Sequence, residues 1–409
     1  MTKRMALDAA WQPSSALVGR VRQASAARAR DAWSLLESAV AVDSSPDDLP
    51  GLEQVIEIVR PTFDDLGAVT TIERTRAGLP VLHARRTLEG SDNLRVLMVG
   101  HLDTVFPAGT VASWPIDRRD GQVSAPGIAD AKGGAVVMWL ALASAIEATD
   151  GLRGLDVHLV LNTDEEAGSV QSRPIFEREA QATDIALIYE PGRPDGTIVR
   201  QRRGARRYRI HVRGKAAHTG VEPWVGVNAI EAAAHKTLAL QALNDRDRFL
   251  SVTVAVVSGG SRINIVPDRA TLEVDTRLPD TVSAEETHRS VEAIVEREDV
   301  PGSSATYEIV SDRPPLMPQD GVPGLLRRFA TAGKALGIEV RDSATGGGSD
   351  GCFISPYGVP TVDALGPVGG GYHTRDEFIR EETLLERAQL SGLVLAGLAG
   401  TRRGSDSAA

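Results

Sequence analysis

The segment Asn93–Pro107 constrains the fold of this chain most strongly. It begins with a short apolar run, Val96–Val99, which predicts a strand buried on both faces. His101 and Asp103 follow the run two residues apart, so an extended backbone would direct both side chains to one face. Open α/β sheets bind ligands at the carboxyl ends of their strands. We therefore expect His101 at a ligand site with Asp103 orienting it, while a structural or capping role explains this pair alone equally well.

Carboxylates follow two further predicted strands. Glu165 and Glu166 come after the apolar run 155–161, and Glu190 directly follows the apolar run 185–189. Adjacent carboxylates at the end of a buried strand repel each other unless positive charge lies between them, although a solvated loop would also relieve the repulsion. Three such acids and one histidine at strand ends indicate a common site.

Two glycine-rich loops supply the remaining candidates. Asp130 lies in the segment APGIADAKGG, which opens the apolar helix predicted over 135–146. Glycines permit a loop that wraps closely around a ligand, whereas Asp130 alone would also serve as the N-cap of that helix. His373 lies in the second loop, GGGYHTRDE.

Together, the candidate side chains have the composition of a two-metal site: His101, Asp130, Glu165, Glu166, Glu190 and His373. Two neutral imidazoles and three ligating carboxylates carry three negative charges, and two divalent cations would leave one positive charge that favours hydroxide over water between them. Nitrogen and oxygen ligands without sulfur suit Zn²⁺, with Co²⁺ or Mn²⁺ as possible substitutes. Asp130 is the best placed to bridge. Of Glu165 and Glu166, one would ligate and the other would move protons, and the residues alone do not decide which.

Composition narrows the classes of protein and partner. With 409 residues the chain predicts two domains, and its net charge of −10 argues against nucleic acid as the main partner. The basic run 201–213 fits one solvated strand face better than a nucleic-acid patch. The lone Cys352 excludes an intrachain disulfide and fits a reducing compartment. The run 135–146 is too short to cross a bilayer, and the basic N-terminal segment has no apolar core typical of a signal peptide, so we expect a cytoplasmic protein without a membrane partner.

The order of predicted elements indicates an α/β chain interrupted by a second domain. Strands and helices in the order β-α-β-β-α-β over 201–310 predict a small open-faced sandwich inserted into the larger domain. We expect the first part of the larger domain at 1–203, the insert at 204–314 and the second part at 315–409. Residues 1–30 show no clear pattern. Near the end of the chain we expect a helix over 323–336, a strand over 339–341 and a final helix over 382–399.

The motifs, taken in order, resemble those of the dinuclear zinc exopeptidase family: GHLDTVFP, GIADAKGG, NTDEEAG, YEPG, KAAHTGVEPWVGVNAI, INIVPDRATLEVDTR and GGGYHTRDE. The family includes glutamate carboxypeptidase, aminoacylase, acetylornithine deacetylase and succinyl-diaminopimelate desuccinylase, and the resemblance spans about 32–399. It implies a mixed central sheet flanked by helices, with the insert serving as the dimerisation domain of a homodimer that holds two Zn²⁺ per subunit.

The resemblance also implies a role for each candidate side chain. His101 and Glu190 would bind one zinc ion, and Glu166 and His373 the other. Asp130 would bridge the two. Glu165 would be the general acid and base, and Asp103 would orient His101 from behind.

Further side chains resemble the residues that hold substrate in this family. His218 resembles a histidine that reaches across the dimer to stabilise the oxyanion, although a histidine before Thr-Gly is also a common turn residue. Five others would hold carboxylates of the substrate: Asn264, Arg277, Arg313, Gly348 and Ser349. The alternatives are strand-end capping for Asn264, a surface salt bridge for Arg277 and a linker salt bridge for Arg313.

Within the family, two activities fit the sequence. Glu190, where the family's aminopeptidases carry Asp, resembles the carboxypeptidase and deacylase branches. The segments SDRPPL and GPVGGGYHTRDEFI resemble bacterial glutamate carboxypeptidases that release C-terminal glutamate from folate-like substrates, although the secreted members carry a leader that we do not find here. An N-acyl-amino-acid deacylase is the alternative, since it needs the same metals and the same grip on a free α-carboxylate. A non-catalytic scaffold would have lost a ligand or the base, and all of them are present.

Overall fold

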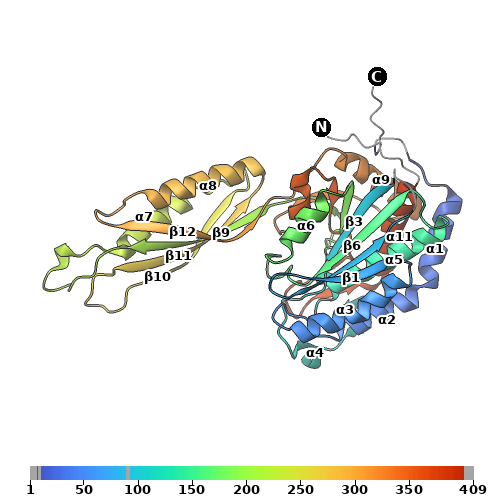
Figure 1. Ribbon diagram of the computed structural model, residues 1–409, viewed down its shortest axis with the longest axis horizontal. Helices are drawn as coiled ribbons and strands as arrows, with labels where there is room; N and C mark the ends of the chain where they lie inside the picture. Colours follow the sequence, from blue (N-terminus) through green and yellow to red (C-terminus); the bar gives the residue numbers. More distant parts are fainter. Residues whose placement is uncertain (1–6, 8–10, 89–92, 400–409) are drawn as a thin grey trace, which may run out of the picture. The chain divides into compact units, whose positions relative to one another are not determined.

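The computed structural model describes residues 7, 11–88 and 93–399. The chain forms two compact units (Figure 1): unit 1 ends at Arg200 and resumes with Pro318–Ala344 and from Ser349 onward, and unit 2 contains Gln201–Met317 together with Thr345–Gly348. The chain passes between the units at 200/201 and at 317/318, three residues from each of the domain boundaries expected at 203/204 and 314/315. Residues 345–348 belong to unit 2, whereas the sequence predicts them in the larger domain.

A six-stranded mixed sheet forms the centre of unit 1, with strand order β1-β2-β6-β3-β7-β14. Strands β3, β6, β7 and β14 run parallel. At one edge of the sheet, β2 pairs antiparallel with β6, and β1 pairs antiparallel with β2. His101 pairs with Asn162 on β6, and Val99 pairs with Ile188 on β7. The parallel register therefore brings the carboxyl ends of three strands to one edge. The strands span Val69–Arg74 (β1), Pro80–Arg86 (β2), Leu94–His101 (β3), Leu155–Asn162 (β6), Ile185–Ile188 (β7) and Thr361–Val362 (β14).

Helices cover both faces of this sheet. One apolar core joins alternate side chains of β2, β3, β6 and β7 to six helices: α1 (Ser15–Ala27), α2 (Ala29–Val40), α3 (Leu49–Asp64), α5 (Gly133–Ala148), α9 (Val322–Leu336) and α11 (Glu381–Leu398). The opposite side chains of the same strands pack against α6 (Arg173–Ala180) and α10 (Gly351–Ile354). Burial on both faces explains why β3 is a continuous apolar run instead of an alternating one.

Helix α5 is the most buried of the long helices of unit 1. The stretch Ile128–Ala148 is long and apolar enough to span a membrane by length and composition, but 94% of its apolar window lies inside the fold. A core helix passes the same test, and the packing of α5 against α11 and α1 identifies it as one.

Two expectations from the sequence were wrong at the edges of this domain. Residues 15–27, which show no clear pattern, form helix α1, which is capped by the Ser14 hydroxyl and buried through Val18, Val21, Ala24 and Ser25. The strand expected at 339–341 lies instead at β13 (Asp342–Thr345). The preceding residues end α9: Gly337 has a φ of +73°, and the Ile338 amide donates to the Gly333 carbonyl, as in a Schellman cap.

Shorter elements complete unit 1. A second, four-stranded sheet has the order β15-β16-β5-β4 and pairs Phe378 on β16 with Ser124 on β5. These strands span Asp117–Arg119 (β4), Gln122–Ser124 (β5), Gly369–Gly370 (β15) and Phe378–Arg380 (β16). The remaining short elements of unit 1 are α4 (Thr110–Ser113) and the one-turn segments Ile128–Lys132 and Ser355–Tyr357. Strand β8 (Ile198–Arg202) crosses from unit 1 into unit 2, and the one-turn helix Pro223–Val225 lies in unit 2.

Unit 2 is an antiparallel sheet covered by two helices, with strand order β10-β11-β9-β12. Its core joins inward side chains of the strands to the apolar faces of the helices. The elements follow each other in the expected β-α-β-β-α-β order: β9 (Gly204–Arg213), α7 (Ala229–Gln241), β10 (Ser251–Gly259), β11 (Arg269–Leu278), α8 (Thr281–Glu296) and β12 (Ser304–Arg313).

The basic run on β9 is matched by acids on its neighbours. The guanidinium of Arg207 lies 3.1 Å from Asp275 on β11, and that of Arg206 lies 2.8 Å from Asp312 on β12. Arg209 pairs with both Glu273 and Glu308, at 3.2 and 2.8 Å. Cross-strand ion pairs therefore account for these arginines on the sheet.

Gly134 provides a test of how closely α5 packs on the sheet. A β-carbon at this position would lie 1.9 Å from the Tyr189 carbonyl oxygen, so Gly134→Ala must push α5 away from the end of β7. We expect a loss of about 1–3 kcal/mol in unfolding free energy, measured by denaturant titration. Gly19, in α1, has no atom within 4 Å of such a β-carbon, so the matched Gly19→Ala should gain up to about 1 kcal/mol. Equal stability of the two variants would contradict this packing.

Candidate metal centre

The carboxyl ends of β3 and β7, with the loop before α5, form the first group of possible ligands. The His101 Nε2 atom lies 3.0 Å from Asp130 Oδ1 and 3.8 Å from Glu190 Oε1. The exposed fractions of the His101, Asp130 and Glu190 side chains are 0%, 13% and 8%, so all three are largely buried. One nitrogen and two carboxylate oxygens thus face a common point.

A second group shares Asp130 with the first. His373 Nε2 lies 3.3 Å from Asp130 Oδ2 and 3.2 Å from Glu166 Oε2. In each group, one ligand atom per residue can be chosen so that all lie within 4.8 Å of one another. The two oxygens of Asp130 therefore face different histidines, which is the arrangement a bridging carboxylate needs. His373 is about half-exposed, so the centre is open to solvent on that side.

Asp103 supports both groups from behind. One of its carboxylate oxygens lies 3.3 Å from His101 Nδ1, and its other oxygen accepts a hydrogen bond of 2.9 Å from the Glu166 amide. The side chain is fully buried. Asp103 therefore directs His101 Nε2 toward Asp130 and also holds the backbone of a ligand from the second group.

Glu165 lies near both groups. Its negative charge raises the pKa of Glu166 and that of Glu190, so its carboxylate lies within electrostatic reach of one ligand from each group. It is partly exposed, in the loop that follows β6. That position suits a group that exchanges protons with a bound water.

Two carboxylates of this centre, Glu166 and Glu190, have raised pKa values. Burial raises the pKa of Glu166 to about 7 and that of Glu190 well above its usual value, and repulsion from Asp130 and Glu165 acts in the same direction. Hydrogen bonds with Asp130 and Glu166 raise the pKa of His373 to about 10. Burial would also raise the pKa of Asp130, but hydrogen bonds with the two histidines of the centre outweigh burial and lower it, so these histidines balance the charge of this carboxylate.

The residues fit two divalent cations. The Glu166 Oε1 atom is buried and has no hydrogen-bond partner among the residues that the model describes. A buried carboxylate oxygen without a partner is costly, and a cation would satisfy it. The set contains two imidazoles, three carboxylates and no sulfur, which suits Zn²⁺ and also permits Co²⁺ or Mn²⁺.

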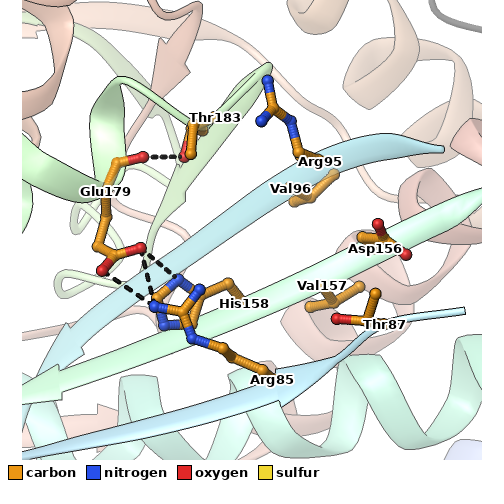
Figure 2. Close-up of a pocket in the computed structure, with 10 residues that line it drawn as sticks. Arg85, Thr87, Arg95, Val96, Asp156, Val157, His158, Glu179 and Thr183 are labelled. Atoms are coloured by element: carbon orange, nitrogen blue, oxygen red, sulfur yellow. Dashed lines mark hydrogen bonds and ion pairs between the residues drawn. The ribbon is translucent and has the colours of Figure 1, made fainter. Parts of the chain in front are cut away.

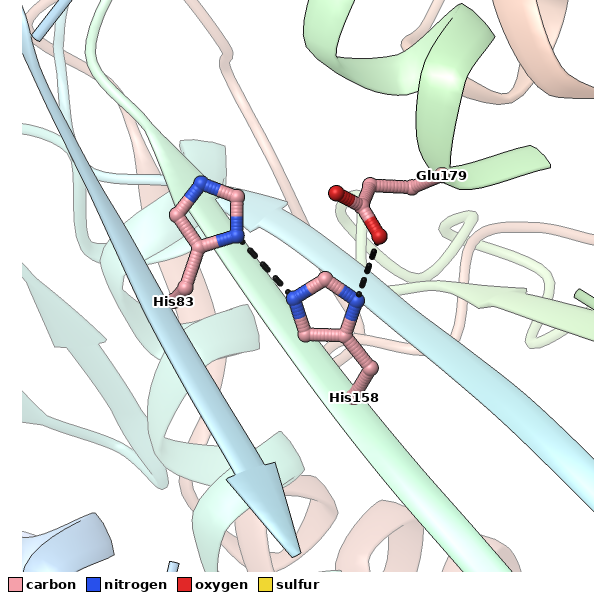
Figure 3. Close-up of side chains that lie close together, drawn as sticks. All are labelled: His83, His158 and Glu179. Atoms are coloured by element: carbon pink, nitrogen blue, oxygen red, sulfur yellow. Dashed lines mark hydrogen bonds and ion pairs between the residues drawn. The ribbon is translucent and has the colours of Figure 1, made fainter. Parts of the chain in front are cut away.

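A third cluster of possible ligands lies elsewhere on the sheet (Figure 3). His83 Nδ1 is 3.0 Å from His158 Nε2, and His158 Nδ1 is 3.2 Å from Glu179 Oε2. The guanidinium groups of Arg85 and Arg178 also lie within 3.0 Å of Glu179. Because these cations already balance the carboxylate, we assign the cluster to a buried ion-pair network.

A pocket of about 120 Å³ lies beside that network (Figure 2). Its lining includes Arg95 and Asp156, which stand at the amino ends of β3 and β6, together with Thr183 just before β7. Three of the candidate ligands stand at or just after the carboxyl ends of the same strands: His101, Glu166 and Glu190. The pocket therefore lies at the amino ends of these strands, and the metal centre lies at their carboxyl ends.

The expected substrate residues fall mainly in unit 2. His218 is exposed and accepts a 3.1 Å hydrogen bond from the Gly220 amide, and Asn264 is exposed. The Arg277 guanidinium already pairs with Asp275 at 2.8 Å. Their relation to the metal centre stays a prediction.

Two other members of the expected substrate set have close neighbours in their own units. A β-carbon on Gly348 would lie 2.6 Å from the Arg313 side chain, so these two expected residues are in contact in unit 2. Ser349, in unit 1, is fully buried and donates its hydroxyl to Asp363. Donation from that hydroxyl to a substrate carboxylate would require this bond to break.

Glu377 is a buried residue of the centre that we did not identify from the sequence. Its carboxylate accepts hydrogen bonds from the backbone amides of Gly127, Ala129 and Asp130. The only signal was its place four residues after His373, and such a spacing does not reveal a partner in a distant loop.

The shared carboxylate predicts the metal content of variants. Asp130→Ala removes a ligand from both groups, so the protein should retain close to zero zinc equivalents after dialysis against limiting zinc. His373→Ala affects only the second group and should retain about one equivalent, measured by mass spectrometry of the metal. His158→Gln in the third cluster is the matched control and should retain about two. A loss of only one equivalent from Asp130→Ala would exclude the bridge.

The chain is similar to known proteins over most of its length. The chain is 28% identical over 371 residues to carboxypeptidase G2 of Pseudomonas sp. (strain RS-16), covering 89% of this chain and 88% of that protein. It is 30% identical over 337 residues to succinyl-diaminopimelate desuccinylase of Magnetococcus marinus, covering 77% and 85%. The solved structure of an aminopeptidase from Bacillus cereus has the same fold, with a TM-score of 0.73 at 22% identity and coverage of 90% and 97%. The model of peptidase family M20/M25/M40 matches residues 97–396, and the chain belongs to this family of metallohydrolases.

Proposed function

We propose that this protein is a dinuclear zinc carboxypeptidase that hydrolyses an amide bond and releases a C-terminal amino acid, glutamate above all, from an acylated or aroylated substrate. The observation that carries the proposal is the pair of ligand groups sharing Asp130, with Glu165 near both. Two zinc ions bound there would act as Lewis acids and lower the pKa of an attacking water.

The chain's own residues supply the proton transfers and the orientation. Glu165 takes a proton from the attacking water and delivers it to the leaving amine, because it is the one carboxylate of the Glu165–Glu166 pair that is not needed as a ligand. Asp103 holds His101 in the tautomer whose Nε2 faces Asp130. His218 would donate to the developing oxyanion, and Asn264, Arg277, Arg313, Gly348 and Ser349 would hold the substrate's carboxylates.

The name of one relative, carboxypeptidase G2, supports release of a C-terminal residue, and the SDRPPL segment around Arg313 supports glutamate. A second activity, hydrolysis of short N-acyl amino acids, is favoured by the 30% identity to a succinyl-diaminopimelate desuccinylase. Both activities use the same metal centre and the same α-carboxylate. They differ in the acyl group on the amine side of the scissile bond.

We further propose that the protein acts as a cytoplasmic homodimer paired through unit 2. The exposed apolar side chains of that unit support pairing, since Val256 and Val257 on β10 and Ile309 and Val310 on β12 are each more than 40% exposed. Neither nucleic acid nor a membrane is proposed as a partner.

A substrate panel tests the proposed activity. The zinc-loaded protein is given pteroyl- and benzoyl-glutamate, N-acetyl amino acids and dipeptides with free amines, each with and without chelator. We expect chelator-sensitive release of glutamate from the aroyl compounds. Preference for the N-acetyl amino acids would select the deacylase instead, and preference for free-amine dipeptides would contradict both proposals.

Glu165→Gln tests the proposed base. Glutamine keeps the size of the side chain but cannot take up a proton, so kcat should fall by roughly 10²–10⁴-fold while the zinc content stays at the wild-type value. Substantial turnover by this variant would refute the assignment. Loss of zinc would instead make Glu165 a ligand.

Arg277→Ala tests the carboxylate grip. If the guanidinium binds the substrate's α-carboxylate in addition to Asp275, the variant should raise KM for free-acid substrates by roughly 10-fold or more and leave C-terminally amidated analogues unaffected. Equal damage to both substrate types would assign Arg277 to its salt bridge alone.

A further inference from the structure

The buried carboxylate of Glu377 lies at the point where two distant loops of the metal centre meet. One loop carries Asp130 and the other carries His373, and 247 residues separate Glu377 from Asp130 in the sequence. Glu377 has no solvent-exposed surface. A buried carboxylate needs partners that repay its desolvation.

Those partners are the backbone amides of the Asp130 loop. Glu377 Oε1 accepts from the amides of Ala129 and Asp130 at 2.9 and 3.1 Å, and Oε2 accepts from that of Gly127 at 3.3 Å. Convergent amides of this kind form an anion-binding nest. The carboxylate therefore fixes the backbone from which the Asp130 side chain projects.

The backbone of Glu377 fixes the other loop. Its carbonyl accepts a 2.7 Å hydrogen bond from the Ser124 hydroxyl, and the next residue, Phe378, pairs with Ser124 in the sheet. Its amide donates to the Thr374 carbonyl at 3.2 Å and closes the turn after His373. His373 itself has a φ of +63°, in the left-handed region that few non-glycine residues adopt, so its direction depends on this turn.

We propose that Glu377 is a positioning residue that aligns Asp130 and His373 with each other, and thereby sets the affinity of the centre for both of its cations. Neither contact places Glu377 on a metal ion, so it acts through the two ligands. The inference rests on the proposed two-metal site.

Replacement by glutamine alters the nest with the least change in shape. Glu377→Gln keeps one oxygen acceptor and turns the other position into an NH₂ group. That group must face either the Gly127 amide or the amides of Ala129 and Asp130, and two donors then oppose each other. The Asp130 loop should shift in either case.

Zinc affinity of the dialysed, metal-free protein tests the proposal, measured by competition with a chromophoric chelator and by absorption of the Co²⁺-loaded form. We expect Glu377→Gln to weaken zinc binding by about 10–100-fold and to change the Co²⁺ spectrum. Asp184→Asn is the matched control. Asp184 is also a buried carboxylate that accepts a backbone amide, from Arg95 at 2.9 Å, but it lies at the amino end of β7, so its loss should lower the melting temperature without changing zinc affinity.

Wild-type zinc affinity and an unchanged Co²⁺ spectrum in Glu377→Gln, with a lowered melting temperature, would overturn the proposal and leave a structural role. If that variant does not fold, Glu377→Asp decides, since it keeps the charge but withdraws the oxygens by one methylene: weakened zinc binding supports the proposal and wild-type affinity overturns it. If the wild-type protein does not bind zinc, the proposed metal centre itself is wrong. Zinc binding by the wild-type protein with unchanged affinity in Glu377→Gln would overturn only the positioning role of Glu377.

Discussion

The metal centre depends most on Asp130, whose two carboxylate oxygens face two different histidines. One oxygen lies 3.0 Å from His101 and the other lies 3.3 Å from His373. Without this carboxylate the centre would be two separate sites, each with one histidine and one glutamate. Two-metal hydrolysis requires the cations to lie within about 4 Å of each other, and a shared ligand enforces such a separation.

The rest of unit 1 serves to hold that carboxylate in place. Parallel pairing of β3 with β6 and β7 delivers His101, the Glu165–Glu166 loop and Glu190 to one edge of the sheet. Helix α5, which follows Asp130, packs so closely that Gly134 touches the Tyr189 backbone beside Glu190. Asp103 and Glu377 then link the loops to each other through backbone amides. A centre with this many like charges depends on such a rigid surrounding because repulsion would otherwise separate its ligands.

Much of this could be predicted from the sequence because the relevant signals are local. A short apolar run followed at once by His101, or by Glu190, already combines a buried strand with a polar side chain at its end. The open-faced sandwich of unit 2 follows from the order of its elements. The family resemblance then distinguished Glu165 from Glu166, which the residues alone had left open.

Other features depend on contacts between distant residues, and no local pattern carries them. Glu377 accepts from amides 247 to 250 positions away, and Ser349 donates its hydroxyl to Asp363. Helix α1 has a short apolar pattern, because it buries only two larger apolar side chains, Val18 and Val21, together with Ala24 and Ser25. The expected strand at 339–341 failed because Ile338 and its neighbours cap α9 instead.

The most direct test of the central claim is the position of bound zinc, determined by anomalous diffraction from crystals of the zinc-loaded protein. We predict two anomalous peaks about 3.5–4 Å apart, one beside His101 and Glu190 and one beside His373 and Glu166, with Asp130 between them. A single peak, or zinc bound at His83 and His158 instead, would contradict it.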